Sequence, residues 1–484
     1  MTSWLPWTSR RGPALRPESM APLFDALAPE RERWLRRNRY YYRQVADLCR
    51  FAIPPGSRVL EIGCGTGDLL AAVSPGRGLG IDISPKMVEL AAARHPGLEF
   101  RSGDAENLEV DETFDYVILS DVVGHLFDVQ GAFAQLHKVS APHTRVIVTS
   151  FNYLWEPLLK LGEALRLKMK VPLQNWLSAG DIGNLLYLTG FETVNSGYRF
   201  LAPRRVPLLS PFVNRFLARL PGIRRLCLSQ FVVARPAAPE ARPEPPACSV
   251  VIPCRNEKGN VEQAVLRTPD IGSRTELIFV EGGSRDGTAE EIERVIAAYP
   301  QRDIKLVRQE NGSGKGDAVR RGFARAGGEV LMILDGDLTV SPEDLPRFYD
   351  ALVEGRGELI NGTRLVYPME RQAMRLLNLL ANKLFSVAFT YLLEQRIRDT
   401  LCGTKVLFAR DYARIAAGRA YFGDLDPFGD FDLLFGAARL QLRIVEVPVR
   451  YRERRYGSTQ IQRFRHGWLL LKMTAIAMRK LKFA

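Results

Sequence analysis

Short apolar runs rich in Val, Ile and Leu alternate with longer stretches of helical periodicity along the chain. The clearest runs lie at residues 58–62, 78–83, 114–120, 230–234, 248–253, 276–280 and 330–334. Apolar runs of this length between helical stretches are typical of βαβ units and of strands buried in parallel sheets. The pattern therefore predicts an α/β fold class, with two groups of strands.

A proline-rich segment separates the two groups. Residues 235–247 read RPAAPEARPEPPA, with five prolines in the eleven positions from 236 to 246. This composition favours extended polyproline II structure, which acts as a semi-rigid spacer. We therefore expect one domain at residues 1–235, a linker at 236–247 and a second domain at 248–484.

The composition sets the scale and the compartment. A length of 484 residues with 46% hydrophobic and 25% charged residues suits two or three globular cores. Six cysteines without a C-x-x-C pair indicate neither a zinc site nor a disulfide framework, and a reducing cytosol fits best. The first twenty residues lack the apolar core of a secretory signal, and no apolar stretch is long enough to span a membrane. We expect a cytoplasmic protein that is soluble or peripheral to the membrane.

A glycine-rich turn, GCGTG at residues 63–67, follows the first apolar run and precedes a helical stretch. Such a turn lets the backbone approach a ligand closely and points amide groups at it. The next run contains Asp82, at the strand end where a carboxylate can accept hydrogen bonds from a ribose. A purely structural turn is one alternative. A nicotinamide site is a weaker one, because the acid Glu61 precedes the turn and the spacing departs from G-x-G-x-x-G.

The motifs VLEIGCGTG, GIDIS, GDAENL and FDYVILSDVVGHL occur in this order. The series resembles class I S-adenosylmethionine-dependent methyltransferases over about residues 40–235. The resemblance implies a Rossmann-like sheet with S-adenosylmethionine as cofactor. The positions it assigns to the cofactor are Glu61, Gly63, Gly65 and Gly67 around the turn, Asp82 and Ile83 at the ribose, Asp104 and Ala105 at the adenine, and Ser120 at the methionine end.

Methyl transfer requires alignment of the nucleophile with the methyl group more than it requires a covalent intermediate. His125 stands near the expected cleft and could deprotonate a hydroxyl, and Asp121 is a similar case. A histidine on a helix surface is the alternative. Residues 40–42 are three tyrosines that could cap the cofactor or simply pack.

Residues 201–227 mix arginines with Leu, Phe and Pro. Contact with a membrane, a cover over the acceptor pocket and a plain insertion between strands all fit this composition.

In the C-terminal group, polar clusters follow the ends of the predicted strands, where ligands bind in open α/β sheets. The last of these clusters is Asp335-Gly336-Asp337. A hard divalent ion such as Mg²⁺ or Mn²⁺ takes carboxylate oxygens from one or two residues and completes its shell with diphosphate oxygens and water. A D-x-D unit alone is common in loops, but this one follows the motifs PxxNE, VEGGSRDGT and GKGDA.

These motifs in this order resemble family-2 glycosyltransferases of the GT-A fold, and most nearly the dolichyl- or polyprenyl-phosphate sugar synthases, over residues 248 to about 466. The resemblance implies a nucleotide-diphospho-sugar donor and a metal held by Asp335 and Asp337, with Asp337 also in the catalytic set. The positions it assigns to the donor are Pro253, Glu257, Glu281, Gly283, Ser284, Lys315, Asp335, Gly336 and Asp337. Glu281-Gly282 stands where the family usually has a pair of aspartates.

The acceptor side is implied by later motifs. The resemblance suggests Arg364, Asp399, Arg454 and Thr459 as acceptor or phosphate contacts, with Thr459 in place of the family's serine. It also implies an inverting displacement, in which Asp430 or Asp432 is the general base for a hydroxyl acceptor. A lipid phosphate is already anionic and needs no base. A helix cap is the alternative role for these aspartates.

The formal net charge of +13 suggests an anionic partner. Residues 450–484 carry ten Lys and Arg against one Glu, interleaved with apolar residues. From residue 371 to 394, polar positions recur every three or four residues on an otherwise apolar helix. A buried helix is one interpretation, and an interfacial helix on anionic lipid is the other. We expect a membrane surface rather than nucleic acid, because no nucleic-acid recognition motif accompanies the charge.

The sequence therefore predicts a bifunctional enzyme, a methyltransferase joined to a glycosyltransferase, at the cytoplasmic face of a membrane. One alternative is a soluble enzyme that tailors a secondary metabolite. Another is that one half is a non-catalytic binding module.

Overall fold

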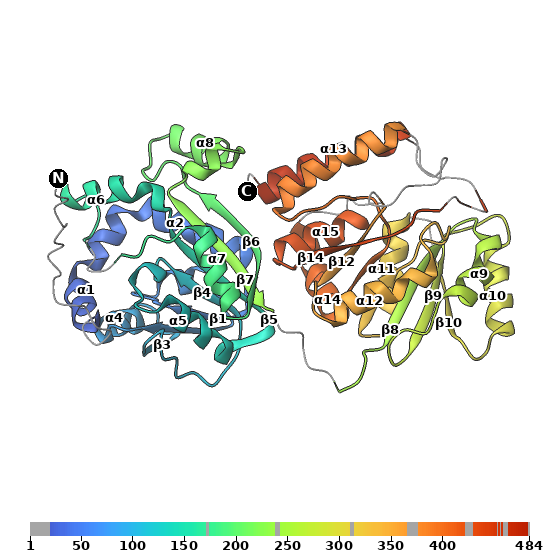
Figure 1. Ribbon diagram of the computed structural model, residues 1–484, viewed down its shortest axis with the longest axis horizontal. Coiled ribbons are helices and arrows are strands. Elements are labelled where there is room, and N and C mark those ends of the chain that lie inside the picture. The colour runs from blue at the N-terminus through green and yellow to red at the C-terminus, as the bar shows by residue number, and fades with distance from the viewer. Residues whose placement is uncertain are drawn as a thin grey trace, which may run out of the picture. The chain divides into compact units, whose positions relative to one another are not determined.

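The computed structural model describes residues 20–170, 174–237, 243–309, 314–364, 376–421, 429–452, 454, 456–457 and 463–482. The chain divides into two compact units, Met1–Pro236 and Ala237–Ala484. Each unit is built around its own α/β sheet (Figure 1).

The sheet of the first unit has the strand order β3-β2-β1-β4-β5-β7-β6. The strands are β1 (Arg58–Ile62), β2 (Arg77–Asp82), β3 (Glu99–Ser102), β4 (Phe114–Ser120), β5 (Ser140–Phe151), β6 (Phe191–Arg199) and β7 (Ser229–Pro236). The helices include α1 (Met20–Arg37), α2 (Arg39–Ala52), α3 (Asp68–Ala72), α4 (Pro85–Arg94), α5 (Val129–Gln135), α6 (Glu156–Ala164), α7 (Ala179–Leu188) and α8 (Leu209–Arg215). The five neighbouring strands β3, β2, β1, β4 and β5 are parallel to one another. Strand β7 lies between β5 and β6 and is antiparallel to both. The predicted Rossmann-like sheet is thus confirmed.

The apolar runs become the centre of this sheet. Val59 and Leu60 of β1 are fully buried, and Leu60 lies level with Leu79 of β2 and Val117 of β4. Because the paired strands are parallel, their carboxyl ends meet at one edge. The glycine turn after β1, Asp82 at the end of β2 and Ser120 at the end of β4 therefore come together at that edge.

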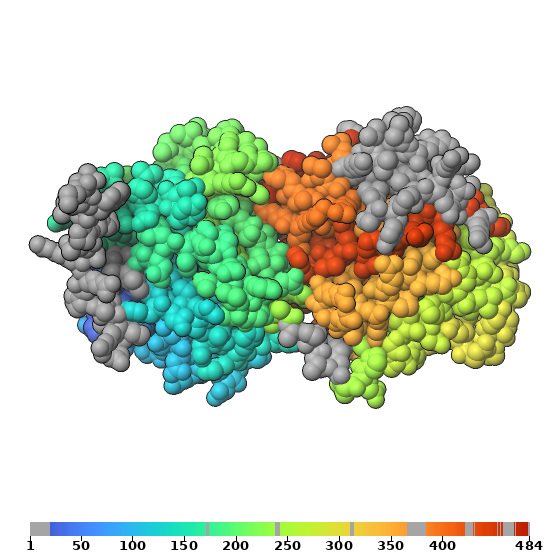
Figure 2. All heavy atoms as spheres, in the orientation of Figure 1, coloured from blue at the N-terminus to red at the C-terminus, as the bar shows by residue number. Residues whose placement is uncertain are grey.

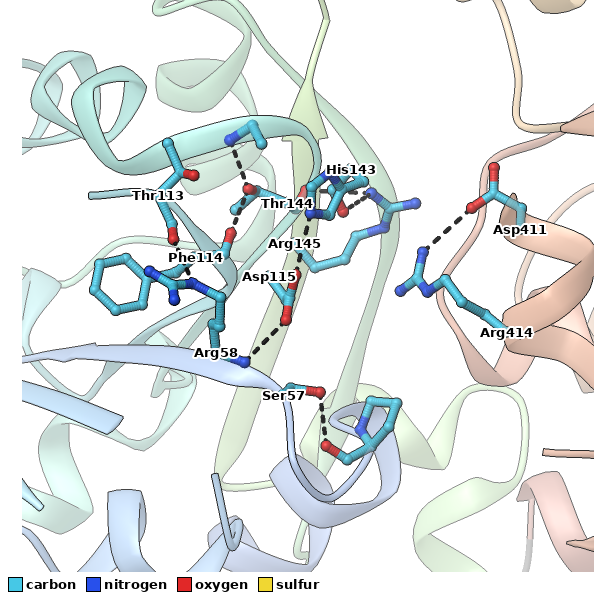
Figure 3. A network of polar contacts seen from close by, with 12 residues as sticks. Ser57, Arg58, Thr113, Phe114, Asp115, His143, Thr144, Arg145, Asp411 and Arg414 are labelled. Atoms are coloured by element: carbon cyan, nitrogen blue, oxygen red, sulfur yellow. Dashed lines mark hydrogen bonds and ion pairs between the residues drawn. The ribbon is translucent and has the colours of Figure 1, made fainter. Parts of the chain in front are cut away.

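The opposite edge is held by a polar network (Figure 3). The carboxylate of Asp115 accepts the backbone N–H of Arg58 at 2.9 Å and contacts the His143 ring at 3.1 Å. Thr144 donates its hydroxyl to the Phe114 carbonyl at 2.5 Å, beside the register shift between Phe114 and Tyr116. These contacts tie the starts of β1, β4 and β5 together, so we assign them a structural role.

The second unit has the strand order β10-β9-β8-β11-β13-β12-β14. The strands are β8 (Cys248–Cys254), β9 (Thr275–Glu281), β10 (Asp303–Arg308), β11 (Val330–Ile333), β12 (Leu359–Thr363), β13 (Lys405–Phe408) and β14 (Ile444–Pro448). The helices include α9 (Lys258–Arg267), α10 (Thr288–Ala298), α11 (Lys315–Arg325), α12 (Leu345–Val353), α13 (Leu376–Leu393), α14 (Ala409–Ala417), α15 (Asp430–Arg439) and α16 (Arg463–Ala477). Strands β10, β9, β8 and β11 are parallel, and β13 is antiparallel to both of its neighbours. This mostly parallel sheet confirms the predicted GT-A class.

Helix α13 turns part of its predicted polar stripe toward the protein. Ser386 and Thr390 donate to the carbonyl of Ile397, and Glu394 forms an ion pair with Lys482. The stripe positions 371 and 375 lie outside the described residues. Among the helices of the described ranges, none combines the length and the hydropathy that a membrane span requires.

Candidate active sites

The glycine turn of the first unit is held by Asp82. One carboxylate oxygen of Asp82 accepts the N–H of Gly65 at 2.8 Å, and the other accepts the N–H of Ser84 at 2.9 Å. Gly63 and Gly65 have φ values of 73° and 51°, in the left-handed region that favours glycine. A Cβ on Gly63 would also lie 2.6 Å from Cγ2 of Val122. The turn therefore requires glycine for both its backbone conformation and its packing.

A cavity of about 470 Å³ opens above this turn. The cavity is lined by nearly all of the positions predicted for cofactor binding and by the predicted base. These residues are Glu61, Gly63, Gly65, Asp82, Ile83, Asp104, Ala105, Ser120 and His125. Gly67 is not among its lining residues. It precedes α3 and packs so closely that a Cβ would lie 2.5 Å from the ring of Phe100. We therefore assign Gly67 to the packing of the turn.

Three buried or half-buried carboxyl groups of this cavity share one nearby cation. Burial raises the pKa of Glu61 to about 8 and that of Asp121 to about 6, and it also raises the pKa of Asp82. The guanidinium of Arg31, from α1, opposes the rise in all three. Sequence reasoning missed Arg31, because nothing in α1 marks one arginine among several. Oε2 of Glu61 has no hydrogen-bond donor among the described residues, so it can accept a bond from a ligand.

Asp121 forms a pair with Tyr41. The hydroxyl of Tyr41 donates to the two carboxylate oxygens of Asp121 at 2.8 and 3.1 Å. Asp121 has a φ of 56°, an uncommon conformation that is found at functional sites more often than elsewhere. Both residues line the cavity beside Ser120. Of the three tyrosines at residues 40–42, Tyr41 is thus the one that contacts Asp121, the second candidate base.

The other two candidates at this end are engaged. The hydroxyl of Ser120 lies 3.0 Å from that of Thr149. His125 is half-buried in a 3-10 turn, Val123–His125, and its ring lies edge-on to Phe24 with 5.6 Å between the ring centroids. Asp121 and His125 both line the cavity, and the role of either residue as a base stays a prediction.

In the second unit, the loops after β8 and β9 hold each other. The Glu281 carboxylate accepts the N–H of Ser284 at 2.5 Å, and the Ser284 hydroxyl accepts the N–H of Asn256 at 2.9 Å. Gly283, between them, has a φ of 72°. A Cβ on Gly336 would lie 2.8 Å from the Pro253 carbonyl, so the D-x-D turn packs directly on the end of β8. The structure thus brings Pro253, Glu281, Gly283, Ser284 and Gly336 together.

Each carboxylate of the D-x-D unit contacts a cation. Asp335 forms an ion pair with Lys315 at 2.5 Å, and Asp337 forms one with Arg454 at 2.6 Å. Burial would raise the pKa of Asp335, but the ammonium group of Lys315 holds it below its usual value. Arg454 also contacts Glu257 at 3.2 Å, and burial raises the pKa of Glu257 to about 7.

The donor set of this unit suits a hard divalent ion. Asp335 and Asp337 offer carboxylate oxygens, and among the described residues no group of three or more His, Cys, Asp or Glu forms a closed metal cage. An ion held here would take its remaining ligands from phosphate and water, as Mg²⁺ usually does. Gly403, which sequence reasoning did not select, faces Asp335 and Lys315 so closely that a Cβ would overlap both.

The structure describes the side chains of some predicted acceptor contacts and general bases but not of others. Arg364 binds Asp399 through two parallel contacts of 2.6 and 2.8 Å, and both side chains are largely buried. Asp432 forms an ion pair with Arg419 at 2.7 Å. Asp430 begins α15, but its side chain lies outside the described part of the chain, as does Thr459. The roles of these residues stay predictions.

Each of the two units also matches the model of a known protein family. Residues 34–196 match the family model of a methyltransferase domain, and residues 249–414 match that of glycosyl transferase family 2. Each unit therefore contains a domain of the predicted kind, a methyltransferase domain in the first unit and a glycosyl transferase family 2 domain in the second, which confirms both resemblances.

Individual relatives match parts of the chain. The dolichol-phosphate mannosyltransferase of Saccharomyces cerevisiae is 33% identical over 22% of this chain, which spans 40% of that protein's length. The polyprenol monophosphomannose synthase of Mycolicibacterium smegmatis is 28% identical over 44% of this chain and 80% of its own. A solved SAM-dependent methyltransferase of Thermotoga maritima, described as a possible histamine N-methyltransferase, covers 45% of this chain and 99% of its own with a TM-score of 0.36 and 20% identity.

Proposed function

We propose that the chain is a bifunctional enzyme of glycolipid or glycan-precursor assembly. In this proposal residues 248–484 transfer a sugar from a nucleotide-diphospho-sugar, with inversion, to a lipid-phosphate or glycan acceptor. Residues 1–235 transfer a methyl group from S-adenosylmethionine to a related acceptor, and residues 236–247 link the domains. The observation that carries the proposal is that each sheet gathers its predicted ligand-binding residues at the carboxyl ends of its parallel strands.

For sugar transfer, the loops after β8 and β9 would hold the nucleoside, and Lys315 with the D-x-D unit would hold the diphosphate. A divalent ion bound there would offset the negative charge that develops on the leaving nucleotide. Arg454 lies within reach of the same phosphates, and its planar guanidinium suits them. A lipid phosphate is favoured as acceptor, because Asp432 is engaged by Arg419 and a phosphate nucleophile needs no base. The names of the yeast and mycobacterial relatives point to the same acceptor class.

For methyl transfer, S-adenosylmethionine would supply an electrophilic methyl group in the cavity. Asp82 and Glu61 present carboxyl oxygens to hydroxyl or ammonium donors of the bound cofactor. The carboxylate of Asp121 is placed to accept the proton of an acceptor hydroxyl, while Tyr41 holds the carboxylate by its hydrogen bond. An oxygen acceptor fits this pair best.

We further propose that the second unit contacts an anionic membrane surface from the cytoplasm. Leu384 and Val387 of α13 are 67% and 70% exposed, which suits an interfacial helix. Lys480 and Lys482 make internal contacts, so they contribute less than the sequence count suggests.

Ligand binding tests the proposal directly. Calorimetry of the full chain should detect S-adenosylmethionine binding, and a thermal-shift screen of nucleotide sugars with Mn²⁺ or Mg²⁺ should raise the melting temperature, because a ligand of the native state stabilises it. If the chain binds neither S-adenosylmethionine nor any nucleotide sugar, the bifunctional assignment is contradicted. Absence of one kind of binding would leave that unit a non-catalytic module.

A further inference from the structure

The first unit carries an apolar surface outside the proposed reaction. Among the described residues, twelve of the twenty-one exposed large apolar side chains lie within residues 153–165 and 206–226. We call the exposed side chains of residues 153–165 and 204–226 the α6–α8 face. Single exposed leucines are ordinary, whereas a concentrated group marks an interaction surface.

The two segments of this face are joined by hydrogen bonds. Trp155 donates its indole N–H to the Leu226 carbonyl at 2.8 Å. The side-chain amide of Asn152 donates to the carbonyls of Arg225 and Cys227, both at 2.9 Å. In Figure 1 the α6 and α8 segments lie along the same upper side of the unit, and Figure 2 shows the α8 region, in green, as a raised part of its surface.

Both segments turn apolar side chains outward. Leu154, Leu158, Leu161 and Leu165 follow one another at helical spacing and are 48% to 60% exposed. In the other segment, Leu208 is 89% exposed and has a φ of 64°. The N–H of Leu209 donates to the Pro207 carbonyl at 2.7 Å across it, so Leu208 forms the tip of a strained γ-turn. A strained turn that presents a leucine to solvent has no role in the core.

Positive charge accompanies the apolar side chains. Residues 201–228 contain six arginines and no Asp or Glu. Arg205, Arg215 and Arg225 are exposed, and no ion pair of the described residues includes them. Arg224 and Arg225 also line a polar cavity of about 330 Å³ beside Leu154. Unneutralised arginines beside exposed leucines are complementary to anionic headgroups above acyl chains.

The cofactor cavity opens at this face. Leu158 and Arg204 line the cavity, and both are exposed, so they mark its rim. An acceptor that entered past them would come from whatever the α6–α8 face contacts.

We propose that the α6–α8 face docks the methyltransferase unit on an anionic lipid bilayer, with its leucines in the acyl boundary and its arginines at the phosphates. The methyl acceptor then reaches the cavity from the lipid side, a consequence that rests on the proposed methyl transfer. Nucleic acid would use the arginines but leave the exposed leucines in water. This contact is separate from the one proposed for the C-terminal unit.

Vesicle co-sedimentation of the full chain tests the docking. An apolar variant (Leu161→Gln, Leu208→Gln, Phe212→Gln) and a charge variant (Arg205→Glu, Arg215→Glu, Arg225→Glu) should each lower partitioning onto phosphatidylcholine–phosphatidylglycerol vesicles by about tenfold or more. The control Lys86→Glu with Leu90→Gln, on α4 of the same unit, should not. Pure phosphatidylcholine vesicles should bind the charge variant and the parent chain similarly. Unchanged partitioning of both face variants would overturn the proposal.

A fluorescent label locates the contact. All six native cysteines are buried, so Leu208→Cys can be labelled selectively with an environment-sensitive dye. We expect a blue shift on anionic vesicles for the label at position 208 and none for Leu90→Cys. Two outcomes would assign the face to a protein partner instead. In the first, the chain binds vesicles but the label at position 208 stays in water. In the second, the chain does not bind vesicles and a face variant abolishes its self-association.

Two further measurements separate the possible failures. Lys472→Glu with Arg479→Glu, exposed positions of the C-terminal segment, tests membrane contact by the other unit. S-adenosylmethionine binding by the face variants reports whether the methyltransferase unit is intact. If the parent chain does not bind S-adenosylmethionine, the proposed methyl transfer is contradicted, whereas the result on membrane docking still holds.

Discussion

Glu61 illustrates how burial and charge act on a single residue. Its side chain is 3% exposed, and the folded unit keeps it protonated up to about pH 8, whereas its ordinary pKa is 4.5. A carboxyl group with a raised pKa stabilises the fold below pH 4.5, and that contribution is lost as the pH rises through 8.

Glu61→Gln should therefore flatten the alkaline loss of stability. At pH 9 we expect the first unit of the variant to be more stable than the parent by about 5 kcal/mol, because no buried carboxylate has to ionise. At pH 4 the difference should be small. Urea denaturation at both pH values measures it, and a stability difference independent of pH would contradict the prediction.

Asp121→Asn should remove a pH-dependent step from methyl transfer. The base acts when deprotonated, so the parent rate should rise with pH and level off above about 6. The variant should lose about a hundredfold in rate and lose that rising limb, while its affinity for S-adenosylmethionine stays unchanged. Transfer of labelled methyl groups to a membrane lipid extract, followed across pH, is the measurement. A variant with the parent's pH profile would exclude Asp121 as the base.

At the scale of elements, the glycine turn between β1 and α3 is constrained both by its backbone conformation and by side-chain packing. Gly56, which precedes β1, has only the first of these constraints. Gly63 has a positive φ and a close neighbour, whereas Gly56 has a φ of 81° and nothing within 4 Å of its Cβ position. Gly56→Ala should cost about 1 kcal/mol for the backbone alone, and Gly63→Ala about 2–4 kcal/mol because Val122 must also move. Equal losses in urea denaturation would show that the turn is not packed as described.

The side chain of Arg454 contacts Asp337 of the D-x-D unit, although the two residues are 117 positions apart in the chain. Arg454→Ala leaves Asp337 and Glu257 without this cation, so we expect Mn²⁺ to bind about fivefold more tightly in the absence of donor. Sugar transfer should fall, because a phosphate contact is lost. Arg452→Ala, an exposed arginine of the same segment, is the control. Electron paramagnetic resonance counts free Mn²⁺, and weaker binding by the Arg454 variant would contradict the prediction.

At the scale of the whole molecule, each unit keeps its own sheet and its own candidate site. Gly65→Arg should abolish S-adenosylmethionine binding and leave nucleotide-sugar binding intact. Asp335→Ala with Asp337→Ala should abolish sugar transfer and leave cofactor binding intact. Calorimetry and a transfer assay on both variants form the test. Full sugar transfer by the double variant would disprove the assignment of the D-x-D unit.

The sequence by itself determined what depends on near neighbours. Apolar runs become buried strands because their pattern makes them so, and motifs such as residues 63–67 and 335–337 carry their chemistry within a few positions. Parallel strands then bring these motifs to one edge of each sheet. The fold class was predictable on this basis, and so were the cofactor positions at the strand ends that line the cavity.

Only the tertiary structure decided what depends on distant partners. Tyr41 meets Asp121 from a position 80 residues away, and Arg31 faces three carboxyl groups that follow it in the chain. The insertion of β7 between β5 and β6 is likewise a matter of long-range pairing. The composition of residues 201–227 left three interpretations open, and only the fold shows which of their apolar side chains are exposed. Tertiary packing, and not the local sequence pattern, decides which side chains are exposed to solvent and which charged groups form pairs.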